Sequence, residues 1–348
     1  MSTQALPIWR KRLFGTPATG VVTILLALLF AWLAIPIIRW ALIDATWVGT
    51  SRSDCAPGGA CWVFIRARFG QFMYGLYPAD QRWRADLCGL AFAFAGAGLF
   101  MAPARLRLKL ALAALVVLPP LGIWLLAGGF GLRWIETREW GGLMLTLFIS
   151  VYASLIAIPL GILFALGRQS QLRVIRLVSI LFIEFWRGVP IIAVIFLASL
   201  LLPLILPSGI GIDRLARAVI GLGLVIAAYM AEAIRGGLQA LPPGQREAAT
   251  ALGLGYWKAT GLIVLPQALR ISLPAMTNEI IALLKNTTLV LVVSILDLLG
   301  IAQASLADPN WVGMSMEAYV FSGGIYWLLC YAMSRFSRRL ETAAGQRH

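Results

Sequence analysis

Histidine is almost absent from this sequence: of 348 residues only His348, at the last position, is a histidine. Imidazole supplies many protein zinc sites and the general base of Ser-His-Asp catalysis. Neither kind of site is therefore expected, and no metal or cofactor is predicted. The Gly-x-x-x-x-Gly-Lys-[Ser/Thr] pattern of nucleotide-binding loops is also missing, so any use of ATP requires another chain.

Charge is scarce as well. Only 13% of the residues are charged and 60% are hydrophobic, with a mean hydropathy of +0.85, whereas an ordinary soluble domain carries about 25% charged residues. Several apolar runs are close in length to the about 20 residues that a helix needs to cross a hydrocarbon core. Because lipid offers no hydrogen bonds to the backbone, helices are the default for such runs. The composition predicts an all-α polytopic membrane protein.

Acidic residues are half as frequent as basic ones, 15 against 29, which gives a formal charge of +14. Such a charge is also found in nucleic-acid-binding proteins. Here, however, the basic residues form short clusters between apolar runs, as residues that anchor helices at a bilayer surface do. The expected partner of these clusters is the lipid bilayer, and nucleic acid is not expected.

The apolar runs predict about eight membrane-spanning helices. They cover residues 20–38, 87–104, 110–128, 142–166, 189–206, 218–234, 271–291 and 319–333. Lys/Arg clusters before the first run and after the last place the N-terminus and the C-terminus in the cytoplasm. The first run is longer than the apolar part of a signal peptide and no Ala-x-Ala site follows it, so it reads as a signal anchor.

The chain divides into two modules near the glycines of residues 128–131. Residues 1–133 hold three spans and a predicted periplasmic loop, 44–86. Cys55 and Cys61 both lie in this loop, and thiols outside the cytoplasm tend to pair, so a small disulfide is expected. Free thiols or a metal site are the alternatives. Residues 134–340 hold the remaining five spans.

Two segments at predicted cytoplasmic edges place a carboxylate three residues before an arginine. These are Glu184 with Arg187 and Glu232 with Arg235. Residues at this spacing share a helix face and can form an ion pair. Charges in a membrane are unfavourable unless they are paired or hydrated. Either a structural ion pair or a gate would explain each segment, and the sequence does not separate the two.

The span over residues 271–291 is the most polar one. Its candidate residues for a translocation path are Asn278, Glu279, Lys285 and Thr288. Asn278 and Lys285 are seven residues apart and share a face. Polar groups inside a span usually face the bundle interior or a wet cavity, although hydrogen bonds between helices are the simpler explanation.

The polar loop over residues 235–270 separates two strongly apolar segments. Leu241-Pro-Pro-Gly244 can begin a helix, residues 245–252 read as helical, and Gly253 ends it. Small residues dominate this helix, which suits docking into a groove of a partner more than lying on lipid. A solvated amphipathic loop is the alternative.

Together these segments resemble the permease subunit of polar amino-acid importers of the ATP-binding-cassette (ABC) superfamily, over residues 141–340. The matching motifs are Glu184-Phe-Trp-Arg187, Gly244-Gln-Arg-Glu-Ala-Ala249, Ala251-Leu-Gly253, Leu265-Pro-Gln-Ala268 and Leu284-Lys-Asn-Thr-Thr-Leu289. The three extra N-terminal spans look like those of the M-type permease subunit of general L-amino-acid uptake systems of Gram-negative bacteria. One departure is Asn286, where many relatives carry an aspartate.

The resemblance implies a five-helix type I ABC importer permease core with three extra N-terminal helices, in a bacterial inner membrane. It implies a cytoplasmic ABC ATPase dimer, a second permease subunit and a periplasmic amino-acid-binding protein as partners. ATP hydrolysis would belong to the ATPase, so this chain is not expected to be an enzyme. Glu247, Ala248, Ala249 and Gly253 would contact the ATPase. A secondary amino-acid transporter that uses Glu279 is the alternative, but such proteins usually show an internal repeat, and none is visible.

Overall fold

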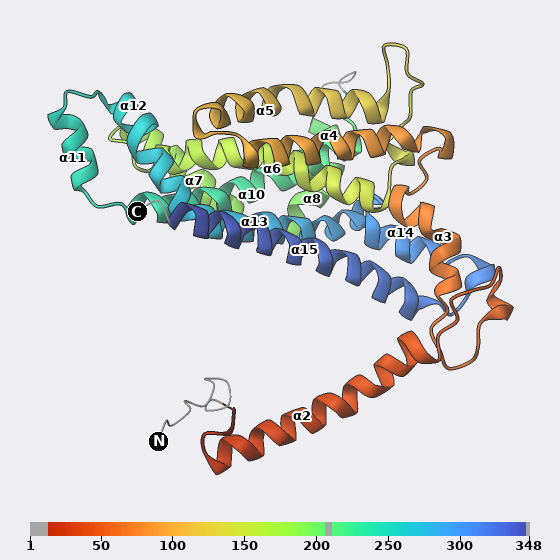
Figure 1. Cartoon of the computed structure of the whole chain (residues 1–348). Coiled ribbons are helices and arrows are strands. Elements are labelled where there is room, and N and C mark those ends of the chain that lie inside the picture. The colour runs from red at the N-terminus through yellow and green to blue at the C-terminus, as the bar shows by residue number, and fades with distance from the viewer. Residues whose placement is uncertain (1–12, 206–210, 346–348) are drawn as a thin grey trace. The chain divides into compact units, whose positions relative to one another are not determined.

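The computed structural model describes residues 13–205 and 211–345 (Figure 1). The basic cluster at residues 10–12 and His348 lie outside these residues, so the orientation of the chain in a membrane stays a prediction. The described residues form helices and loops, with isolated β-bridges but no strand. The predicted all-α class is therefore confirmed.

The described chain forms two compact units. The first comprises residues up to Arg68 and residues 306–318. It contains α2 (Pro17–Ile38), the π-helical turn Arg39–Ile43, the short turns Arg52–Asp54 and Pro309–Trp311, and the start of α3 (Trp62–Tyr74). Thr16 caps α2 by accepting a hydrogen bond from the N–H of Thr19, and Pro17 occupies the first turn. No residue of α2 is buried, as expected for a helix that faces lipid.

Contacts distant in sequence hold the first unit together. The N–H of Cys61 donates to Oε1 of Glu317 at 2.9 Å, and Arg68 forms an ion pair with Asp308. The rings of Phe64 and Trp311 lie 5.6 Å apart. Residues 306–318 therefore pack on the start of α3.

The second unit comprises residues 69–305 and 319–345 of the described chain. Its helices, besides the end of α3, are α4 (Arg82–Met101), α5 (Ala104–Ala127), α6 (Gly142–Arg168), α7 (Arg173–Gly188), α8 (Ile191–Leu200), α9 (Leu202–Ile205), α10 (Arg214–Gln239), α11 (Gly244–Ala251), α12 (Tyr256–Ala259), α13 (Leu265–Asn286), α14 (Leu298–Ser305) and most of α15 (Ser315–Gly345). A π-helical turn (Thr260–Val264) and 3-10 turns (Ala79–Gln81, Thr137–Glu139, Thr287–Val293) connect them.

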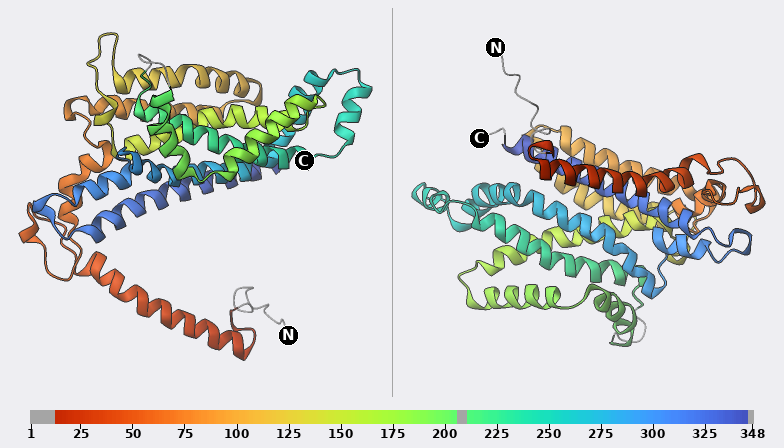
Figure 2. Two further views of the ribbon diagram at one scale, coloured as in Figure 1. Left: turned by 180° about the vertical axis from the view of Figure 1, so that it is seen from behind. Right: turned by 90° about the horizontal axis from the view of Figure 1, so that it is seen from below.

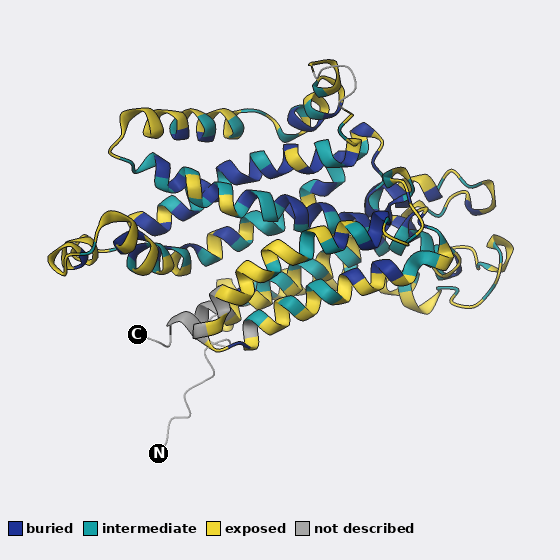
Figure 3. Ribbon diagram, turned by 90° about the horizontal axis from the view of Figure 1, so that it is seen from above, coloured by how far each residue is buried: buried dark blue, intermediate teal, exposed yellow. Residues whose placement is uncertain are grey.

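α10 is the central helix of the second unit and packs against α6, α7, α8 and α13. It has buried residues along most of its length, and Figure 3 colours the buried residues of the ribbon dark blue. Close approach depends on glycine at the crossings: a Cβ at Gly161 would meet Met230, and one at Gly237 would meet the carbonyl of Ala268. Small residues thus set the helix spacing in the core.

Five described helices are long and apolar enough to cross a membrane: Pro17–Ile43, Lys109–Ala127, Gly142–Arg168, Arg214–Gln239 and Tyr256–Val293. The count rises to six if α7 and α8, which meet at a bend of 100°, form one broken span. A multi-pass architecture is confirmed, but the count of eight spans stays a prediction. The region predicted at 87–104 lies mostly in α4 and that at 319–333 lies in α15, but neither helix is among these candidates.

The single span expected over residues 189–206 is instead the two short helices α8 and α9 in the described residues, and α8 meets α7 at a bend of 100°. Gly188 ends α7, and Pro190, which has no N–H to donate, directly precedes α8. The predicted module boundary between residues 133 and 134 lies inside the second compact unit, so it stays a prediction about sequence organisation.

α11 and α12 lie at the end of the second unit that is far from α14 (Figures 1 and 2). The N-terminus of α6 is at the α14 end, where the N–H of Gly142 donates to the carbonyl of Leu296 at 3.1 Å. The C-terminus of α6 accordingly reaches the α11 end.

Candidate functional site

The helix predicted in the polar loop is present as α11, within one residue of its expected limits. Pro243 precedes it, and Glu247 lies in its first turn, where a carboxylate is favourable with the helix dipole. At its other end, the N–H of Gly253 donates to the carbonyl of Thr250, and that of Leu254 to Ala249. Gly253 has φ = 75°, the left-handed conformation this ending requires.

Three of the four residues expected to contact an ATPase are exposed: Glu247, Ala248 and Gly253. Ala249 is only 1% exposed and packs toward the protein, so its side chain is not available to a partner in this structure. Leu252 and Trp257, which the sequence analysis did not single out, are each 79% exposed. The sequence could have indicated both residues, because large apolar side chains are unusual in a polar loop.

Two side-chain hydrogen bonds join α11 to the ends of other helices. Nη2 of Arg246 donates to Oε1 of Gln169, just after α6, at 2.9 Å. Nε2 of Gln267, on α13, donates to Oε1 of Gln245 at 3.2 Å. A cavity of about 520 Å³ lies beside α11, with Leu238 and Glu247 in its wall. A displacement of α11 would therefore act on both α6 and α13.

Near this end of the unit, Glu232 is the centre of an ion-pair network. Its carboxylate lies 2.7 Å from a guanidinium nitrogen of Arg168 and 2.7 Å from one of Arg235, and 3.8 Å from Arg187. Arg168 also pairs with Glu184 at 3.1 Å. Three arginines thus share two carboxylates.

The expected pair between Glu184 and Arg187 is not among the ion pairs of the described residues. Glu184 instead pairs with Arg168, and the guanidinium of Arg187 lies over the ring of Tyr229, 5.7 Å from its centroid. The i, i+3 rule considers one helix only, whereas partners from α6 and α10 are closer here. Arg168 was missed for the same reason: no carboxylate lies near it in sequence.

The predicted path residues form no ion pair with this network, although Glu279 on α13 interacts electrostatically with Arg187. Asn278 and Lys285 are both exposed, in agreement with a shared face, and Glu279 is half-buried. The hydroxyl of Thr288 donates to the carbonyl of Lys285 at 2.9 Å. Their role in a translocation path stays a prediction.

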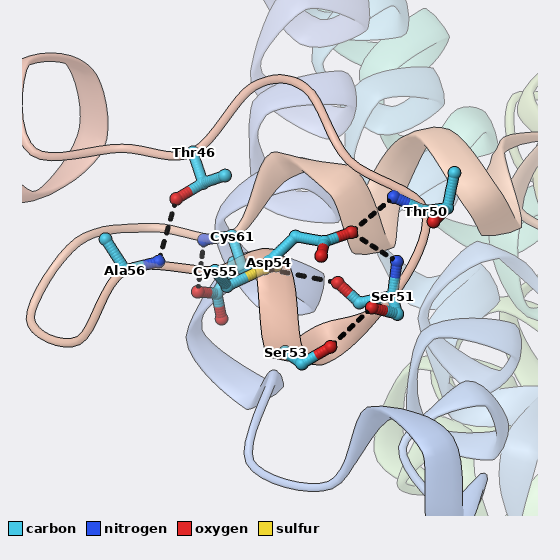
Figure 4. Close-up of a disulfide and its surroundings, with 9 residues drawn as sticks. Thr46, Thr50, Ser51, Ser53, Asp54, Cys55, Ala56 and Cys61 are labelled. Carbon is cyan, nitrogen blue, oxygen red and sulfur yellow. Dashed lines mark hydrogen bonds between the residues drawn. A yellow bond between two sulfur atoms is a disulfide. The ribbon is translucent and has the colours of Figure 1, made fainter.

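Cys55 and Cys61 are joined by a disulfide in the first unit, with Cα atoms 5.5 Å apart (Figure 4). Asp54 organises the neighbouring turn, because its Oδ2 accepts hydrogen bonds from the N–H groups of Thr50 at 2.8 Å and Ser51 at 3.0 Å. These donors hold the pKa of Asp54 below its ordinary value. Within the described chain, no three His, Cys, Asp or Glu side chains come together in a way that would hold a metal ion.

Comparison with known proteins decides the family. Residues 157–345 match the family described as "Binding-protein-dependent transport system inner membrane component". The chain belongs to this family. The matched region of this permease begins at Ala157 in α6 and continues through α7–α14 to the end of α15. It therefore includes α11 and the ion-pair network. The type I ABC importer permease fold is thereby shown.

Two relatives match this permease over nearly its whole length. The inner membrane amino-acid ABC transporter permease protein YhdY of Escherichia coli (strain K12) is 49% identical, covering 98% of this chain and 93% of the relative. The glutamate/glutamine/aspartate/asparagine transport system permease protein BztC of Rhodobacter capsulatus is 36% identical, covering 99% and 94%. The crystal structure of an amino acid ABC transporter with histidines aligns with a TM-score of 0.52 at 31% identity, over 58% of this chain and 92% of that one.

Proposed function

We propose that this permease is the membrane-spanning subunit of an ATP-driven importer of L-amino acids. The observation that carries the proposal is α11, an exposed short helix that is hydrogen-bonded to the ends of α6 and α13. The printed functions of the two full-length relatives, both amino-acid transport permeases, support the substrate class. The chain itself hydrolyses nothing.

In this proposal α11 docks into a cytoplasmic ABC ATPase dimer. Glu247, Ala248 and Gly253 supply the contact, and the exposed Leu252 and Trp257 add apolar surface to it. ATP binding favours one conformation of the ATPase, and α11 transmits this preference to the permease, as coupling between two sites requires.

Substrate would pass along α13, with Asn278, Glu279, Lys285 and Thr288 beside the path. The network around Glu232 would act as a gate near its cytoplasmic end, because its ion pairs join α6, α7 and α10. Exchange of carboxylate partners among Arg168, Arg187 and Arg235 would let the three helices separate.

The remaining parts of the proposal concern the assembly. A second permease subunit would complete the membrane part as a heterodimer, and a periplasmic amino-acid-binding protein would deliver substrate. Both termini would be cytoplasmic, which places the loop with Cys55 and Cys61 in the oxidising periplasm of a Gram-negative cell. The extended N-terminal region would make the chain an M-type subunit.

The test is to purify the tagged chain from its host membranes in mild detergent and to identify what accompanies it. We expect an ATPase and a second permease at fixed stoichiometry, and ATP-dependent uptake of amino acids after reconstitution with the binding protein. A chain that emerges alone and moves amino acids without ATP would overturn the proposal and favour secondary transport through Glu279.

A further inference from the structure

A second cavity, of about 530 Å³, lies in the second unit at the α14 end, away from α11. It is formed by the end of α5, the turn Thr137–Glu139, the first half of α6 and the first two turns of α10. Its volume is within the about 300–1,000 Å³ typical of small-molecule sites. The proposed coupling does not use this cavity.

The cavity wall separates into an apolar part and a charged rim. Phe148, Tyr152, Val219 and Ile220 are among the residues of the apolar part. Ile220 and Ile123 are exposed on helices long enough to cross a membrane, so the apolar part is accessible from the hydrocarbon side. A soluble solute gains little from such a wall, whereas an acyl chain would be well accommodated there.

One arginine at the rim forms no ion pair with the described residues. Glu136 pairs with Arg138 at 2.7 Å, and Asp213 accepts hydrogen bonds from Thr137 and from the first N–H groups of α10. The side chain of the exposed Arg214, in contrast, has no ion pair or hydrogen bond with any residue that the structure describes. The formal charges of the rim balance, but Asp213 is already held by Thr137 and by the N–H groups of Leu215 and Ala216, so the guanidinium of Arg214 keeps its donors for a phosphate.

The wall also contains a hydrogen-bond donor without an acceptor. Trp140 is 4% exposed, and its Nε1 is buried with no partner in the described part of the chain. Buried tryptophan N–H groups usually have a partner. The ester carbonyls of a glycerophospholipid are acceptors of the kind that this group lacks. Trp134, exposed at the rim, is a residue typical of the boundary between water and lipid.

We propose that this cavity binds a glycerophospholipid, with its phosphate on Arg214 and an acyl chain between α5, α6 and α10. The lipid fills a gap in the membrane part of the permease at the face opposite to α11.

The test is native mass spectrometry of the complex purified with the tagged permease, comparing wild type with Arg214→Ala, Arg214→Lys and Ala216→Trp. We expect wild type to retain one phospholipid. Loss of a charge-assisted contact should lower retention at least about tenfold in Arg214→Ala. Arg214→Lys should retain an intermediate amount, and Ala216→Trp, which fills the cavity, should retain none. Arg133→Ala, which removes an exposed arginine near the cavity but outside its wall, should behave as wild type.

A second arm separates lipid from a soluble anion. We expect phosphatidylglycerol added to delipidated complex to raise its Tm, and inorganic phosphate or glycerol phosphate at the same concentration to leave it unchanged. An equal shift with inorganic phosphate would overturn the proposal. So would equal lipid retention in all variants that elute as intact complex, or a photo-crosslinker at residue 216 that labels a protein subunit instead of lipid.

Discussion

At the scale of single residues, Glu232 carries more interactions than any other carboxylate of the ion-pair network. Its replacement by glutamine leaves the exposed Glu184 as the one carboxylate in these ion pairs and Glu279 near Arg187, against the three arginines Arg168, Arg187 and Arg235. Loss of hydrogen bonds to a charged group, together with repulsion among the arginines, should lower stability by about 1–3 kcal/mol. We expect Glu232→Gln to lower the Tm of the purified permease.

Glu184→Gln is the matched control for this prediction. Glu184 is exposed and has one ion pair, so its loss should change stability by less than about 0.5 kcal/mol. Equal shifts of the Tm in the two variants would show that Glu232 is not the centre of the network.

Asp54 gives a pH-dependent prediction in the disulfide loop. The N–H groups of Thr50 and Ser51 stabilise its carboxylate and depress its pKa in the folded loop. A depressed pKa contributes stability that is present above the unfolded value of about 3.9 and is lost as the pH falls through the folded pKa. We expect exchange protection of these two amides, corrected for intrinsic rates, to fall in acid.

In Asp54→Asn the same amides should show no such pH dependence, because the titrating group is gone. Protection that falls with acid to the same extent in wild type and in this variant would assign the effect to another group.

At the scale of elements, the end of α11 depends on one glycine. A residue with a Cβ is strained at the φ of Gly253, by about 1–2 kcal/mol. Gly253→Asp adds a charge at the surface proposed to meet the ATPase. We expect this variant to insert in the membrane at the wild-type level and to lose uptake. Asparagine tolerates the left-handed conformation better, so Gly253→Asn should retain more activity. Undiminished uptake by Gly253→Asp would refute docking through this surface.

The elements that sequence reasoning predicted well are those with local signals. α11 begins directly after Pro242 and Pro243 and ends just before Gly253, so residues next to the helix indicate both of its limits. The span predicted from residue 189 begins within two residues of α8, but the bend of 100° between α7 and α8 was not predicted, because a window of apolar residues does not register the direction of the chain. Spacing predicted the pair of Glu232 with Arg235, which lie 2.7 Å apart. Arg168, which pairs with both Glu184 and Glu232, could not be found from spacing because it reaches them from α6.

At the scale of the whole molecule, the hydrogen bond between Arg246 and Gln169 is a route from α11 to α6. Its loss should weaken the proposed transmission without removing the surface that is proposed to bind the ATPase. We expect Arg246→Ala in the reconstituted complex to hydrolyse ATP while transporting at least about fivefold less solute per ATP. Arg173→Ala, an exposed arginine at the start of α7, should leave this ratio unchanged. A normal ratio in Arg246→Ala would exclude this route.

Composition was enough to predict the helical, multi-pass architecture, because few folds satisfy backbone hydrogen bonds in lipid. It was not enough for the number of spans. The α4 region begins with Arg82, Arg84 and Asp86, so its apolar stretch is short. Arg84 is fully buried, and its hydrogen bonds to the carbonyls of Leu125 and Arg133 compensate for the loss of water. Such compensation depends on residues about 40 to 50 positions away and is invisible in a hydropathy profile.

The contrast between α2 and α10 has a consequence for how the gene can vary. α2 has no buried residue and meets its surroundings through side chains that need only be apolar. α10 meets neighbours on several sides, and at its crossings a single added methyl group would collide. Natural drift should therefore exchange Leu, Ile, Val and Phe freely along α2 while holding the small residues at the α10 crossings fixed. An alignment of related genes would show the difference as two rates of substitution within one membrane protein.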